Sequence, residues 1–243
     1  MQNRHHKMIT VCMATYNGEK YIKEQLESIL PQLAHNDEVI VSDDGSTDST
    51  IDIIKSVSDN RIKIIKNLHQ HSPISNFENA LREAKGNYIF LADQDDVWKK
   101  DKIKICLKWL QNYDCIISDA EVTDEKLNVI SASLYQMLNI KKGRLYNTIR
   151  KNGYTGCCMA FNKQVKDASL PFPKDIPMHD IWIGNVAAYM YQVKFIDDKL
   201  IYFRRHEKAN SCNGKSSKYS IWKQCMFRWH IIKDLIKKII IDK

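Results

Sequence analysis

The chain has 243 residues, of which 44% are hydrophobic and 27% are charged, values typical of a soluble globular enzyme with a sizeable core. No run of about 18 apolar residues occurs, which excludes a membrane-spanning helix. The formal net charge of +8 and a pI of about 9.0 leave nucleic acid, a nucleotide substrate and an acidic membrane surface open as anionic partners.

The first residues lead into only a short apolar run, which is not typical of a signal peptide. The cysteines form an odd set without any C-x-x-C pair. We therefore expect a cytoplasmic protein with reduced, mostly buried thiols and no zinc site. The cysteines are Cys12, Cys106, Cys115, Cys157, Cys158, Cys212 and Cys225.

Strand-like and helix-like segments alternate up to residue 92, which predicts an α/β fold with a mostly parallel, Rossmann-like sheet covered on both faces. In chain order we expect a strand at Met8–Ala14, a helix at Glu19–Leu30, a strand at Asp37–Ser42, a helix ending at Val57, a strand at Arg61–Lys66, a helix at Ile74–Ala84 and a strand at Asn87–Ala92.

The later segments are less regular. We expect a helix at Trp98–Leu110, a strand at Cys115–Asp119, an irregular loop over the site at Glu121–Gly143 and a strand at Gly153–Phe161 interrupted by Gly156. A helix from Met178 to about Ala188 and a hairpin of Val193–Ile196 and Leu200–Phe203 around Asp197 and Asp198 should follow. The chain should then continue with a polar irregular stretch at Arg204–Ser217 and a long helix at Tyr219–Ile241. One domain would have two halves, residues 1–120 and 121–215, followed by the helical segment 216–243.

Three carboxylates, Asp93, Asp95 and Asp96, directly follow the predicted strand Asn87–Ala92. In an open parallel sheet, ligands bind at the carboxyl ends of the strands. Crowded carboxylates repel one another unless a cation lies between them, and hard oxygen ligands at this spacing suit Mg²⁺ or Mn²⁺ held partly by a phosphate. The alternative is that Asp95 and Asp96 cap the following helix, although one carboxylate is enough for that.

Polar loops after Ala14, Ser42 and Ala92 should meet at one sheet edge and form a nucleotide-sized crevice. Neither a dinucleotide fingerprint nor a P-loop is present, so phosphate charge would be met by the metal. Asp43 or Asp44 could accept the imide N–H of a uracil or thymine ring. Turn and cap chemistry is the alternative for both carboxylates.

These three loops resemble the signature segments of family 2 glycosyltransferases with the GT-A fold. The segments are Val11 to Gly18, Val41 to Asp48 and Leu91 to Trp98, and the last is similar to the rhamnosyltransferase-like branch. The match extends from Met8 to about His206. One departure is Ser72, which stands where the family pattern has glycine.

The resemblance implies transfer of a sugar from a nucleoside diphosphate sugar with inversion at the anomeric carbon. Thr15, Tyr16, Asn17 and Asp43 would line the nucleoside site. Asp93 would contact the ribose, and Asp95 would hold the metal. The donor would be a UDP- or dTDP-sugar, dTDP-rhamnose included, and the acceptor a glycan or lipid-linked glycan of a surface polysaccharide.

Inversion in one displacement needs a general base beside the acceptor hydroxyl. Asp180, where an extended chain enters a helix, occupies the matching acidic position of the resembling enzymes. At a helix start we expect a low basicity, and an N-cap role is the alternative. We interpret His179 as a spacer or a substrate contact.

Tyr202 to His206 is similar to a Tyr-Arg-x-His segment of the same branch, in which the histidine can complete the metal or diphosphate site. Arg204 and Arg205 could neutralise a leaving diphosphate. The alternative for His206 is an ordinary surface histidine. Thr155 and Gly156 resemble an acceptor-side turn, where a glycine would let the backbone approach the sugar.

The terminal helix carries an apolar, aromatic stripe with a basic fringe, which is typical of an element that lies on an anionic membrane. Peripheral contact with the inner face of the cytoplasmic membrane would suit a lipid-linked acceptor. The alternative is a helix packed back on the domain with solvated lysines.

Two other functions remain open. A nucleotidyltransferase would need a Gly-rich basic loop after the first strand, and the residues from Thr15 to Glu19 do not supply one. A non-catalytic basic protein could bind nucleic acid or lipid. We expect no nucleic acid, because the excess charge is concentrated near the terminal helix and no base-reading module occurs.

Overall fold

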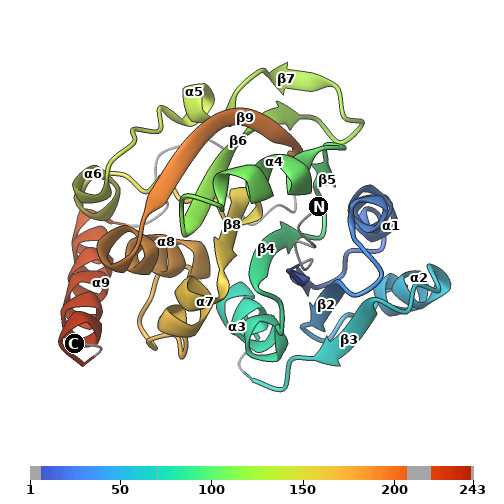
Figure 1. Ribbon diagram of the computed structural model, residues 1–243, viewed down its shortest axis with the longest axis horizontal. Helices are drawn as coiled ribbons and strands as arrows, with labels where there is room; N and C mark the ends of the chain where they lie inside the picture. The colour runs from blue at the N-terminus through green and yellow to red at the C-terminus, as the bar shows by residue number, and fades with distance from the viewer. Residues whose placement is uncertain (1–6, 70, 207–219, 242–243) are drawn as a thin grey trace, which may run out of the picture.

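The strands of the computed structural model form one curled sheet (Figure 1), and the structure describes residues 7–69, 71–206 and 220–241. From one edge to the other, the strands are β3 (Ile62–Lys66), β2 (Glu38–Asp43), β1 (Ile9–Thr15), β4 (Tyr88–Asp93), β8 (Met159–Asn162), β6 (Cys115–Thr123), β9 (Val193–Arg204) and β5 (Val97–Trp98), and β7 (Val129–Ser131) pairs with β6.

The four strands β3, β2, β1 and β4 run parallel, and the central strands β2 and β1 are mostly apolar because both of their faces are buried. In this register Thr15 lies opposite Asp43, and Ala14 lies opposite Asp93. The predicted meeting of three polar loops at one sheet edge is therefore confirmed.

Helices surround the sheet (Figure 1), which confirms the predicted fold class. They are α1 (Ile22–Ile29), α2 (Thr50–Ser56), α3 (Pro73–Glu83), α4 (Lys102–Trp109), α5 (Leu134–Leu138), α6 (Arg144–Ile149), α7 (Lys163–Ser169), α8 (His179–Met190) and α9 (Ile221–Ile241), with 3-10 turns at Leu30–Gln32 and Gly156–Cys158. Within the described ranges, none of these helices has both the length and the apolar character needed to cross a bilayer.

Helix α3 illustrates how local sequence sets an element. The Ser72 side chain accepts a hydrogen bond from the Ser75 N–H (3.2 Å), and Pro73 takes the first helical position. Phe77, Ala80 and Leu81 then fall on one side at helical spacing and are buried, so the helix packs against β1 and β2. Ser72 thus caps α3 in place of the glycine of the family pattern.

The predicted hairpin around Asp197 and Asp198 is wrong. Strand β9 is continuous and runs parallel to β6 on both sides of these residues. Ser118 pairs with Ile196 and Asp119 pairs with Lys199, so the two aspartates form a bulge. Two adjacent aspartates favour a turn and a bulge alike, and the pairing with β6 decides between them.

The predicted helix start at Trp98 is also wrong. Val97 and Trp98 form the short strand β5, which pairs antiparallel with the end of β9, and α4 begins only at Lys102. This pairing brings the residues that follow β9 beside the acidic segment that follows β4.

The predicted irregular loop at Glu121–Gly143 is wrong as well, because β6 continues to Thr123 and β7 and α5 follow. The Asp119 carboxylate accepts hydrogen bonds from the Ser133 hydroxyl (2.6 Å) and the Tyr135 N–H (3.0 Å). Of the strand predicted at Gly153–Phe161, only β8 forms, and it runs antiparallel to β4 and β6.

Five cysteines are buried and Cys225 is exposed, and none of these six forms a disulfide within the described ranges. Cys212 and most of the predicted polar stretch up to Ser217 lie outside the described residues.

We predict that Gly86→Ala destabilises the protein by about 1–3 kcal/mol, the cost of overpacking. An added Cβ would lie 2.5 Å from the Thr10 nitrogen and 2.9 Å from the Ile9 carbonyl carbon. These atoms belong to central strand β1 and have no room to shift. Urea denaturation measures the loss. Lys85→Ala, at the exposed neighbouring position, is the control, and an equal loss in both variants would contradict the explanation.

Candidate active site

A cavity of about 960 Å³ opens at the carboxyl ends of β1 and β4. Most of the predicted site residues line it, and Asp43 and Arg205 do not. The predicted residues in its wall are Thr15, Tyr16, Asn17, Asp44, Asp93, Asp95, Thr155, Gly156, Asp180, Arg204 and His206.

Asp43 closes its own turn. Its carboxylate accepts hydrogen bonds from the N–H groups of Gly45 and Ser46 (both 3.0 Å), the Ser46 hydroxyl (2.5 Å) and the Thr15 hydroxyl (3.2 Å). The turn chemistry that was the alternative for this residue is thus present. Asp43 orients Thr15 and stands behind the cavity wall.

Asp44 is the carboxylate of this pair that faces the cavity. It accepts a hydrogen bond from the Asn67 amide (2.7 Å) and lies 3.1 Å from His71 Nδ1. The His71 ring in turn meets the Tyr16 ring edge-on, with 4.4 Å between centroids. A carboxylate and two rings therefore form one corner of the cavity, which has the chemistry to bind a planar base.

Gln94 joins the loops after β1 and β4. The Tyr16 N–H donates to its carbonyl (2.9 Å), and its amide donates to the Tyr16 carbonyl (3.0 Å). Asn17, at a φ of +47°, accepts a hydrogen bond from the Thr47 N–H (2.8 Å). The sequence analysis did not predict this linking role of Gln94. The only sign of it in the sequence was an amide side chain among carboxylates.

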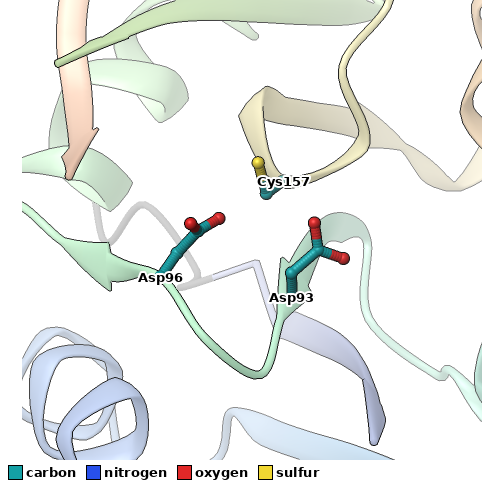
Figure 2. A group of neighbouring side chains, drawn as sticks. All are labelled: Asp93, Asp96 and Cys157. Atoms are coloured by element: carbon teal, nitrogen blue, oxygen red, sulfur yellow. The ribbon is translucent and has the colours of Figure 1, made fainter. Parts of the chain in front are cut away.

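The side chains of Asp93 and Asp96 extend toward the turn that carries Cys157 (Figure 2), and the candidate ligand atoms of the three residues lie within 4.8 Å of one another. Burial and the neighbouring charges of Asp95 and Asp180 raise the pKa of Asp93 to about 7. Burial, then the charges of Asp95 and Asp93, raise the pKa of Asp96 well above its usual range.

The Asp96 carboxylate is only half satisfied. One oxygen accepts a hydrogen bond from the Arg204 N–H (3.0 Å), and the other is buried without a hydrogen-bond partner in the described structure. Asp95 lies 2.8 Å from His206 Nε2. Neither aspartate caps α4, whose N-cap residue is Asp101, so the capping alternative is wrong.

The residues of this corner fit a hard divalent cation. Carboxylate oxygens and an imidazole nitrogen are ligands that Mg²⁺ or Mn²⁺ accepts. Asp95 Oδ2 and His206 Nε2 are joined by a hydrogen bond of 2.8 Å, which places two candidate ligand atoms side by side. Cys157 fits poorly, because a hydrogen bond with Cys158 and burial raise the pKa of its thiol, which favours the protonated form.

A buried lysine lies behind the acidic segment. The Lys102 ammonium donates to the Cys157 carbonyl (2.8 Å) and lies 4.7 Å from the centre of the Trp98 ring. Its charge partly offsets the rise in the pKa of Asp93. In the sequence Lys102 is one of several helix lysines, and nothing local marks it as buried.

Asp180 lies in the first turn of α8 and accepts a hydrogen bond from the Gly156 N–H (3.1 Å). Burial raises its pKa to about 6, so the expected low basicity is wrong: burial outweighs the helix N-terminus. The N-cap residue of α8 is Met178, so Asp180 is not the N-cap, and its carboxylate accepts a hydrogen bond from the Ile181 N–H in the first turn (2.7 Å).

His179 forms part of the cavity wall and stacks on Phe77, with 3.9 Å between ring centroids. Burial lowers its pKa to about 3, and neither ring nitrogen has a hydrogen-bond partner in the described structure. A Cβ on Gly156 would lie 2.9 Å from His179 Nε2. The glycine therefore leaves room for this ring, where we had expected it to make room for a sugar.

The two arginines differ in their surroundings. Arg204 forms an ion pair with Glu24, and its guanidinium also donates to the Glu125 carbonyl (2.9 Å). Binding a diphosphate would compete with both contacts. Arg205 lies in a neighbouring open depression of about 710 Å³ and contacts Met137 Sδ at 3.6 Å.

The chain is also similar to known glycosyltransferases. The model of "Glycosyl transferase family 2" matches residues 10–168. The UDP-Glc:alpha-D-GlcNAc-diphosphoundecaprenol beta-1,3-glucosyltransferase WfaP of Escherichia coli is 29% identical over 85% of this chain and 81% of its own. The dTDP-rhamnosyl transferase RfbG of Shigella flexneri is 28% identical over 80% of this chain and 72% of its own.

Two solved structures share the fold. S. aureus TarS 1-349 in complex with UDP-GlcNAc has a TM-score of 0.69 at 19% identity, and covers 96% of this chain. The mannosyltransferase PcManGT from Pyrobaculum calidifontis in complex with GDP-Man and Mn²⁺ has a TM-score of 0.65 at 19% identity and the same coverage. The present chain spans 66% and 65% of those longer chains. Because the family model covers most of the chain and the cavity carries the family's signature segments, this protein belongs to glycosyl transferase family 2.

Proposed function

We propose that the protein transfers a sugar, with inversion, from a nucleoside diphosphate sugar to a hydroxyl of a glycan or lipid-linked acceptor in surface polysaccharide synthesis. The observation that carries this proposal is that Asp180 and the acidic segment from Asp93 to Asp96 line one cavity. A base and a cation-binding segment facing one another suit a displacement in which a proton and a diphosphate leave on opposite sides.

The donor side is formed by the first half of the domain, residues 1–120. Thr15, Tyr16 and Asn17 line the nucleoside site and Asp93 meets the ribose. Asp44 accepts a hydrogen bond from the imide N–H of the nucleobase. Asp43 holds the turn that orients Asp44. A UDP- or dTDP-sugar is the proposed donor, and dTDP-rhamnose is supported by the likeness to the rhamnosyl transferase.

Asp95 and His206 are the proposed ligands of Mg²⁺ or Mn²⁺, because both line the cavity and their side chains already meet through a hydrogen bond. When bound, the cation supplies Lewis-acid stabilisation of the departing diphosphate. Arg204 and Arg205 remain candidates for phosphate contacts, although Arg204 would first have to leave Glu24.

The acceptor side is formed by the second half of the domain, of which the structure describes residues 121–206. Asp180 removes the proton of the acceptor hydroxyl, held in place by the Gly156 N–H. Thr155 and Gly156 border this position. The stacked ring of His179 forms part of the same wall, and both of its nitrogens are buried.

Calorimetry with UDP, dTDP and GDP, with and without Mn²⁺, tests the proposed function. We expect one of these nucleotides to bind, and Mn²⁺ to increase its affinity at least about tenfold by neutralising the repulsion between phosphates and carboxylates. Salt-sensitive binding of single-stranded nucleic acid without nucleotide binding would instead support a basic binding protein.

For Asp180→Asn we expect a loss of turnover of about 10²–10⁴-fold with donor binding unchanged, because the amide keeps the shape but has lost the base. Nucleotide release with a soluble acceptor measures turnover, and calorimetry measures donor binding. Asp198→Asn, an exposed aspartate on β9, is the control. Full activity in Asp180→Asn would exclude this base.

The wild-type rate should also follow the ionisation of Asp180. A base works in its deprotonated form, so the rate should fall as the pH drops through about 6, where burial has raised its pKa. The residual activity of Asp180→Asn should lack this fall between pH 5 and 8.

Asp93→Asn should raise the melting temperature of the protein in EDTA at pH 7.5. In the folded chain the pKa of Asp93 is raised from 3.8 to about 7, so the stability present below about pH 4 is lost as the pH rises through 7. Asparagine removes that charge. The increase in melting temperature should be smaller at pH 4, because Asp93 is then already protonated in the folded wild type. Asp198→Asn should leave the melting temperature unchanged. A lower melting temperature for Asp93→Asn at pH 7.5 would refute the proposed repulsion.

A further inference from the structure

Helix α9 has two apolar sides. Ile231 and Leu235 on one side are buried against the domain, where α9 packs on α6 and α8. Trp222, Trp229, Ile236 and Ile240 fall seven or four residues apart on the opposite side, and their exposed fractions are 74%, 64%, 53% and 69%. The helix is therefore packed on the domain and still presents an aromatic and aliphatic stripe.

Helix α6 extends the same exposed region. It lies beside α9 (Figure 1), and the Arg228 guanidinium donates to the Arg150 carbonyl (2.8 Å). Leu145 and Ile149 of α6 are 63% and 52% exposed. We call the exposed sides of these two helices, with the basic residues in segments 141–151 and 220–241, the α6–α9 surface.

The positive charge of the chain is concentrated on these two segments. They contain ten lysines and arginines and one acidic residue, Asp234, whereas the formal net charge of the whole chain is only +8. Lys233 and Lys237 are exposed, within or next to the apolar stripe. Lys237 approaches Asp234 only to 4.0 Å, so its charge is available for an anionic surface.

We propose that the α6–α9 surface docks on a lipid bilayer that contains anionic lipids, with α9 lying in the plane of the interface. Exposed tryptophans suit the headgroup region, aliphatic side chains suit the acyl boundary, and lysines suit anionic headgroups. A second copy of the chain is a poor occupant, because a two-fold contact would place two strongly positive surfaces against each other. The α6–α9 surface lies outside the cavity, and docking on a bilayer is separate from the transfer reaction.

Co-sedimentation of the full chain with vesicles tests the proposal. The wild type should bind vesicles of phosphatidylglycerol and phosphatidylcholine and should bind pure phosphatidylcholine at least about tenfold more weakly. The double variant Lys233→Glu/Lys237→Glu should bind the anionic vesicles at least about tenfold more weakly than the wild type.

The matched control is Lys104→Glu/Lys108→Glu on α4. These lysines are also exposed and four residues apart, and the change in net charge is identical. Helix α4 lies away from α9 (Figure 1), so this variant should keep near wild-type binding. Equal losses in the two double variants would mean that net charge alone attracts the protein, and would overturn the proposal.

A second variant, Trp222→Ser/Trp229→Ser, tests the apolar part. It should lose vesicle binding at high salt, where the lysines are screened. Wild-type binding in this variant would overturn the proposal. A second result would also overturn it: light scattering that finds a dimeric wild type and a monomeric tryptophan variant. The apolar stripe would then bind a second copy of the chain. Nucleotide binding should be unchanged in all variants, which separates this test from that of the proposed function.

Discussion

Three carboxylates crowd the carboxyl end of the buried strand β4, because Asp93 is its last residue and Asp95 and Asp96 follow it, and the site is organised around them. Two of them, Asp93 and Asp96, are close enough to each other and deep enough for burial to raise their pKa values. Ionised carboxylates in such a position cost free energy unless positive charge or hydrogen-bond donors compensate for it. The fold supplies Lys102 and the Arg204 N–H, and among the described residues one Asp96 oxygen has no hydrogen-bond partner. A divalent cation would complete this compensation.

The second half of the sheet is organised around that segment. Strand β5 has only two residues, yet its pairing with β9 brings the chain after Phe203 back to the end of β4. The bulge at Asp197 and Asp198 sets the register of this return. Strand β8, antiparallel to β4, begins just after the 3-10 turn that places Gly156 against Asp180. The part of the sheet with parallel and antiparallel strands thus brings the proposed base and the acidic segment together. The all-parallel part forms the corner proposed to bind the nucleoside.

The terminal helix shows how two alternatives from the sequence can both hold in part. One side of α9 packs against the domain, as a helix folded back would. The opposite side keeps its tryptophans and isoleucines in solvent, where burial against a bilayer would be favourable. The contribution of α6 to the α6–α9 surface could not be predicted from the sequence, because segment 134–150 shows no motif.

The parallel half of the sheet and the polar loops after β1, β2 and β4 could be predicted from the amino-acid sequence, because apolar runs and helical spacing are local properties of the chain. The family could be predicted from the residues of those loops. The sequence also singled out Asp93, Asp95, Asp180 and His206 by resemblance. No local pattern predicted that Asp44 faces the cavity while Asp43 closes a turn, or that Lys102 and His179 are buried. The physical reason is that these environments are set by partners distant in the chain, as in the contacts of Asp96 with Arg204 and Asp95 with His206, 108 and 111 residues apart.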